Sequence, residues 1–127
     1  MRILLSTLFL FLFCYNFSFA SGWTIIDSTE DGDFYLNVNK IRNDKNYIYY
    51  WDMVDLYKPS EGGNLSFQRY NQGDCNIIRY KTLQYFFYDQ NLGNGESEKQ
   101  APSNTNWKYF KPNSVGEQIL EYACKIK

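Results

Sequence analysis

The stretch that most constrains the fold covers residues 74–89, with the sequence DCNIIRYKTLQYFFYD. It contains no glycine or proline and is crowded with β-branched and aromatic residues, a composition typical of β-strands. Both alternating sets of positions are largely apolar, as in a strand that is covered on both faces for part of its length. We therefore predict one long strand in the middle of a sheet, with Cys75 near its start.

Several shorter segments have strand or turn composition. Residues 23–26 and 34–36 form a predicted hairpin around Asp31-Gly32, and residues 47–57 a second long aromatic strand. We expect a strand over 65–70, a turn at 71–73, and an irregular crossing or single helical turn over 37–42 followed by a turn at 43–46. Residues 90–106 are polar and contain glycine and proline, so they form the longest predicted loop.

The C-terminal segment has the pattern of a helix. Ser114 is followed three residues later by Glu117, which forms a capping box at a helix N-terminus. Val115, Ile119 and Ala123 then fall on roughly one apolar stripe together with Tyr122. With the strands, this predicts an α+β fold: an antiparallel sheet of about five to six strands with a C-terminal helix packed on it and one disulfide.

The N-terminus has the pattern of a secretory signal. A basic Arg2 precedes an apolar run over 3–13, and Ser18 and Ala20 are small residues at the positions a signal peptidase reads. The run is shorter than the ~20 residues that cross a bilayer. We predict a signal peptide over 1–20 and one domain over 21–127, without a transmembrane segment. Phe13 before Cys14 disfavours lipidation, which requires a small residue there.

Two cysteines, Cys75 and Cys124, lie outside the predicted signal peptide. Cysteines of an exported chain form disulfides in oxidising compartments. We therefore predict that Cys75 and Cys124 are bonded, which would pin the C-terminal helix to the central strand. Closing a loop of this length stabilises the fold by about 4 kcal/mol in the chain-entropy model.

Charge and residue chemistry exclude several classes of function. The formal net charge is −1 with no basic run, so neither nucleic acid nor an anionic membrane is a predicted partner. Histidine is absent, which removes the commonest general base. Asp52 and Asp55 lie three residues apart on one strand and point to opposite faces, and Asp74 is expected to accept a backbone N–H in a turn. We predict no enzymatic activity and no cofactor.

The acidic segment 27–33 deserves comparison with a calcium loop. Asp27, Thr29 and Asp31, followed by Gly32, loosely match the start of such a loop. The twelfth position is Val38, where a bidentate glutamate is required. We interpret the segment as a solvated hairpin tip and predict no metal site.

Aromatic residues are abundant: 12 Tyr, 10 Phe and 3 Trp. Tyrosine combines a large apolar ring with a polar tip and is favoured on surfaces that bind proteins or sugars. Core and sheet packing use the same residues, so both interpretations stay open. The candidate binding surface comprises Tyr47, Tyr49, Trp51, Tyr85 and Tyr88.

An ordered set of residues runs through the domain: Trp23, Phe34-Tyr35, Trp51, Ser66, Tyr70, Asp74-Cys75, Arg79-Tyr80, Gly93 to Gly95, Trp107, Pro112, Ser114 and Cys124. With this set the chain resembles the bacterial surface-adhesin protein E family. The resemblance implies an exported protein with an antiparallel sheet, a flanking C-terminal helix and a disulfide. The founding adhesin is an outer-membrane lipoprotein that binds host matrix and plasma proteins, so the resemblance also implies an extracellular protein or glycan partner.

These observations predict an exported, non-enzymatic binding or adhesion domain that engages protein or glycan through a sheet face or edge. The alternative is a periplasmic small-ligand-binding or envelope accessory protein, with a closed apolar pocket between helix and sheet. The predicted location is the periplasm, the cell surface or the medium.

Overall fold

The computed structural model describes residues 22–127, so the predicted signal peptide over 1–20 lies outside the described residues. One long helix follows a series of strands along the chain. The elements are β1 (Trp23–Ser28), β2 (Gly32–Asn37), β3 (Arg42–Asp44), β4 (Tyr47–Leu56), β5 (Ser66–Asp74), β6 (Arg79–Tyr88), the 3₁₀ turn η1 (Asn91–Gly93), β7 (Ser97–Gln100), β8 (Lys108–Tyr109) and α1 (Val115–Ile126).

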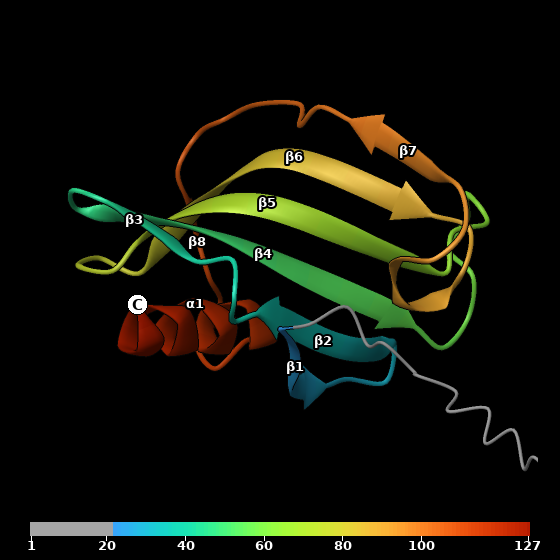
Figure 1. The fold of residues 1–127 in the computed structure, drawn as a ribbon, viewed down its shortest axis with the longest axis horizontal. Helices are drawn as coiled ribbons and strands as arrows, with labels where there is room; N and C mark the ends of the chain where they lie inside the picture. Colours follow the sequence, from blue (N-terminus) through green and yellow to red (C-terminus); the bar gives the residue numbers. More distant parts are fainter. Residues whose placement is uncertain (1–21) are drawn as a thin grey trace, which may run out of the picture.

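The strands form one curled antiparallel sheet in the order β1-β2-β4-β5-β6-β7 (Figure 1). The short strand β3 pairs with the start of β4, and β8 pairs with the start of β6. Helix α1 lies against one face of the sheet, where it contacts β1, β2 and β4. The predicted α+β fold is confirmed.

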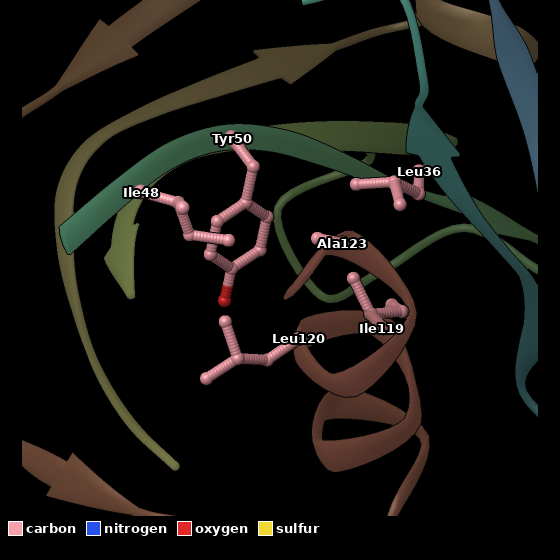
Figure 2. Close-up of a cluster of buried hydrophobic side chains, with 6 residues drawn as sticks. All are labelled: Leu36, Ile48, Tyr50, Ile119, Leu120 and Ala123. Atoms are coloured by element: carbon pink, nitrogen blue, oxygen red, sulfur yellow. The ribbon is translucent and has the colours of Figure 1, made fainter. Parts of the chain in front are cut away.

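The core lies between α1 and the face of the sheet that the helix covers. Figure 2 shows its six fully buried side chains: Leu36, Ile48, Tyr50, Ile119, Leu120 and Ala123. Burying a leucine or isoleucine side chain stabilises a fold by roughly 1.5–3 kcal/mol. The predicted N-cap is confirmed, because the Ser114 hydroxyl accepts a hydrogen bond from the Glu117 N–H at 3.3 Å.

The turn between β5 and β6 differs from the prediction. Residues 71–73 belong to β5, and Cys75 lies in a tight turn before β6 instead of within the central strand. The Asp74 carboxylate stabilises this turn by accepting hydrogen bonds from the N–H groups of Asn76 at 2.9 Å and Ile77 at 3.3 Å. The predicted capping role of Asp74 is therefore confirmed, although the turn begins after it.

Gly73 looks like a turn residue in the sequence but lies inside β5. A Cβ atom added there would lie 2.5 Å from the Leu120 Cδ1 atom and 3.0 Å from the Tyr50 ring. The strand therefore carries glycine at a point where a side chain of α1 packs directly against the backbone of the sheet.

Two predicted loops also contain regular structure. The segment 90–106 includes η1 and β7, and the predicted turn at 43–46 includes the end of β3. Both β3 and β7 are short and fully exposed. Because neither buries a side chain, they lack the apolar alternation that marks a strand in the sequence.

The predicted disulfide is present. Cys75 and Cys124 are bonded, with their Cα atoms 5.8 Å apart. The bond joins the β5–β6 turn to the last turn of α1, so it fixes the C-terminal end of the helix against the sheet.

Candidate functional site

The face of the sheet opposite α1 carries most of the aromatic side chains that do not enter the core. We call it the open face. Strand alternation and the β2–β4, β4–β5 and β5–β6 registers place the following strand residues on it: Tyr35, Tyr47, Tyr49, Trp51, Tyr70, Phe86 and Tyr88. All are partly exposed.

Three open-face rings from three neighbouring strands form the centre of the surface. Trp51 of β4 stacks on Tyr70 of β5, with ring centroids 4.9 Å apart, and meets Phe86 of β6 at 5.6 Å. Tyr49 extends the group and lies 6.1 Å from Tyr70. Offset stacking of this kind adds about 0.5–1.5 kcal/mol per pair. The contacts fix the rings in place and leave part of each exposed.

Cationic side chains surround one end of the open face. The Arg42 guanidinium lies 4.4 Å from the centroid of the Tyr49 ring. Arg79 and Lys81 lie 4.3 and 4.5 Å from the Trp107 ring, which in turn packs against Tyr47. Cation–π contacts orient these charges over the rings, so this end of the face presents aromatic and positive groups together.

The acidic partner at this end is largely hidden. Asp74 is buried, and its carboxylate accepts a hydrogen bond from Arg79 Nε at 3.0 Å. Burial opposes the charge of Asp74, but hydrogen bonds from the Asn76 N–H and from Arg79 outweigh it and lower the pKa of the carboxyl below its usual value. Asp74 therefore stays ionised and holds Arg79 beside Trp107.

The other end of the open face is covered by the η1 segment. The Ser66 hydroxyl accepts a hydrogen bond from the Gly93 N–H at 2.9 Å and donates one to the Gln90 carbonyl at 2.6 Å. Asp55 accepts a hydrogen bond from the Leu92 N–H at 2.7 Å. The accessible part of the open face thus lies between η1 and Trp107.

The structure brings only part of the predicted surface together. Tyr47, Tyr49 and Trp51 are neighbours on the open face, and Tyr88 lies on the same face beside η1. Tyr85 lies on the opposite face, in register with Arg69. The cause is a bulge in the β5–β6 pairing between Tyr70 and Asn71. After the bulge, each β6 residue points to the opposite face of the sheet from the one that uninterrupted alternation would give it.

The same bulge places Phe86 on the open face, where the sequence interpretation did not expect it. Tyr70 and Trp107 were also missed. Alternation along β5 could have indicated Tyr70, which pairs with Trp51 on the neighbouring strand β4. Trp107 has no local signal, because it reaches the face from the segment after β7.

The part of the chain that the structure describes contains no group of three His, Cys, Asp or Glu side chains arranged for a metal ion. Within those residues, no helix is long and apolar enough to cross a membrane. Asp52 and Asp55 lie on opposite faces, as predicted from their spacing, with Asp52 bonded to Arg69 and Asp55 to the η1 segment.

The described residues thus form an α+β domain whose open face carries aromatic and cationic side chains. Comparison with family models is specific: the model of surface-adhesin protein E matches residues 23–125, and the chain belongs to this family. Membership gives it a surface-adhesin type of binding function, directed at extracellular partners, and implies export. Both the predicted family resemblance and the predicted adhesion-type function are confirmed.

Solved structures of Haemophilus influenzae protein E share the fold. One crystal form superposes with a TM-score of 0.61 at 17% sequence identity, covering 83% of this chain and 88% of that chain. Another structure of the same protein gives a TM-score of 0.60 at 18% identity, covering 83% and 85%. Comparison with curated protein sequences finds no match.

Proposed function

We propose that this adhesin engages extracellular protein or glycan through the open face of its sheet. The observation that carries the proposal is the continuous ring cluster of Trp51, Tyr70 and Phe86, which α1 does not cover. Partly exposed aromatic rings held in fixed positions are the groups that dominate protein interfaces and that stack on sugars.

The charges around the rings favour an anionic partner. Arg42 is exposed, Lys81 is half-buried, and both lie over aromatic rings. Asp74 is already bonded to Arg79, and the exposed Asp44 lies two residues from Arg42 on β3. Positive groups beside aromatic rings complement acidic segments of a protein or anionic glycans.

The proposal assigns no catalytic role to the chain. Asp52 and Asp74, the two buried carboxylates of the described residues, are each bonded to an arginine and lie on opposite faces of the sheet. They cannot act as a pair on one substrate. In the proposal a signal peptide over 1–20 directs the domain of residues 21–127 to the cell surface or the medium.

The test is binding of the purified domain to printed glycans and to immobilised extracellular-matrix and plasma proteins at low and high salt. We expect Arg42→Ala combined with Lys81→Ala to weaken binding about tenfold at low salt, with a smaller effect at high salt because salt screens exposed charges. The matched control is Lys58→Ala with Lys125→Ala, two exposed lysines away from the open face. Equal losses for both double variants would contradict the proposal.

A further inference from the structure

A second surface feature lies on the other side of the sheet, at the N-terminal end of α1. A cavity of about 290 Å³ opens there between the helix and the sheet. Phe34, Phe110 and Val115 form apolar walls, and the Asp52–Arg69 ion pair lies at the sheet side. It therefore differs from the closed apolar pocket that a small-ligand carrier was expected to have.

The ion pair leaves hydrogen-bond donors of Arg69 available at the cavity. Asp52 accepts from Arg69 Nε at 2.9 Å and Arg69 Nη2 at 2.6 Å, and its Oδ1 also accepts from Asn71 at 3.3 Å. The Asn71 amide oxygen is bonded to the Thr82 hydroxyl at 2.8 Å. Arg69 has five N–H groups and 22% side-chain exposure, so its outer N–H groups remain available.

Tyr50 supplies an unused donor. Its side chain is only 2% exposed, and its hydroxyl forms no hydrogen bond with any described residue. No described side-chain nitrogen or oxygen is both buried and unpartnered, so the hydroxyl keeps some access to solvent, and Tyr50 is among the residues that line the cavity. Figure 2 shows the ring extending from β4 toward α1, with the hydroxyl beside Leu120. Burial, and then the Asp52 carboxylate, raise the pKa of Tyr50, which keeps it protonated.

The N-terminus of helix α1 adds further hydrogen-bond donors to the cavity. Gly116 lines the cavity in the first turn of α1, where backbone N–H groups lack intrahelical acceptors and the helix dipole favours negative charge. A Cβ atom at Gly116 would lie 2.7 Å from the Phe110 ring, so glycine lets this ring pack against the helix. Phe110 in turn stacks on Tyr80 at 4.4 Å.

We propose that this cavity binds the carboxylate of a small organic acid, with the apolar part of the ligand between Phe34 and Phe110. The outer N–H groups of Arg69 and the Tyr50 hydroxyl are donors without acceptors among the described residues, and Asp52 already accepts three hydrogen bonds. An acceptor-rich anionic group satisfies this arrangement, whereas a cation does not. The site is independent of the open face.

The test is a titration of the ¹⁵N-labelled domain with phenylacetate, followed by amide chemical shifts. We expect saturable shifts at Tyr50, Arg69 and Gly116. The neutral analogue 2-phenylethanol should bind about tenfold more weakly, because its single uncharged oxygen cannot form the bidentate ion pair that a carboxylate forms with a guanidinium.

The informative variant is Tyr50→Phe, which removes only the hydroxyl. We expect it to keep the wild-type thermal midpoint, since no hydrogen bond within the described residues is lost, and to weaken phenylacetate binding about tenfold. Tyr122→Phe, on the exposed side of α1, is the matched control and should bind normally. If Tyr50→Phe unfolds the domain, the comparison of phenylacetate with 2-phenylethanol on the wild type still tests the site.

Three results would overturn the proposal. The first is the absence of saturable shifts at millimolar phenylacetate. The second is equal affinity for phenylacetate and 2-phenylethanol, and the third is unchanged phenylacetate affinity in a folded Tyr50→Phe variant. Loss of open-face binding would not affect these readouts, so the two proposals fail separately.

Discussion

At the scale of single residues, Asp74 connects the fold to the open face. One of its carboxylate oxygens accepts the N–H groups of the β5–β6 turn, and the other accepts Arg79 Nε. Arg79 then lies over Trp107. One buried carboxylate therefore stabilises the turn that carries Cys75 and also positions a cation at the end of the aromatic surface.

Asp74→Asn is predicted to destabilise the domain at neutral pH by about 1–3 kcal/mol, because a buried charge-assisted network loses its charge. The pKa of Asp74 is lowered in the folded state, so its contribution is present above the unfolded pKa of about 3.9 and is lost as pH falls through the lower folded value. Thermal midpoints between pH 7 and pH 2 test this. The variant should show a shallower acid dependence than the wild type, and identical pH profiles would contradict the assignment.

At the scale of elements, α1 is held against the sheet at two places. Leu120 packs over Gly73 in the middle of the helix, and the Cys75–Cys124 disulfide fixes its last turn. The first attachment is apolar and noncovalent, whereas the second constrains the unfolded chain. The helix should therefore remain docked without the disulfide, but in a less stable domain.

Cys124→Ala is predicted to lower the free energy of unfolding by about 4 kcal/mol under oxidising conditions, which corresponds to a fall in thermal midpoint on the order of 20 °C for a domain of this size. Calorimetry of the exported protein measures it. Dithiothreitol should lower the wild-type midpoint to that of Cys75→Ala combined with Cys124→Ala, and should leave the double variant unchanged. A wild-type midpoint insensitive to reduction would contradict a stabilising disulfide.

The elements that bury side chains were predictable from the sequence. The strand expected over 47–57 corresponds to β4, and the capping box at Ser114 marks the start of α1. Gly73 was misread because its local signal is that of a turn, while its position depends on contact with Leu120 far along the chain. The exposed strand β7 carried no burial pattern at all.

The candidate surface was predictable only in part, for the same reason. Alternation along one strand correctly grouped Tyr47, Tyr49 and Trp51. It could not group residues across strands, because a single bulge beside Tyr70 exchanges the faces of Tyr85 and Phe86. A bulge depends on the pairing of two strands, and neither strand alone encodes it.

At the scale of the whole molecule, the two faces of the sheet carry different features. The helix-side face carries the core and the cavity beside Arg69, and the open face carries the ring cluster and its cations. Because one sheet separates them, a substitution on the open face leaves the contacts of α1 unchanged. Binding through the open face can therefore be tested in a folded domain.

The most direct test of the open-face proposal compares wild type, Trp51→Ala and Tyr122→Ala on the printed glycans and the matrix and plasma proteins that the wild type binds. Trp51→Ala removes the central ring of the cluster, and we predict at least a tenfold loss of affinity, as expected for a central aromatic contact. Tyr122→Ala, on the exposed side of α1, should bind as the wild type does. Retained binding by folded Trp51→Ala together with lost binding by Tyr122→Ala would place the adhesive surface on the helix side and contradict the account.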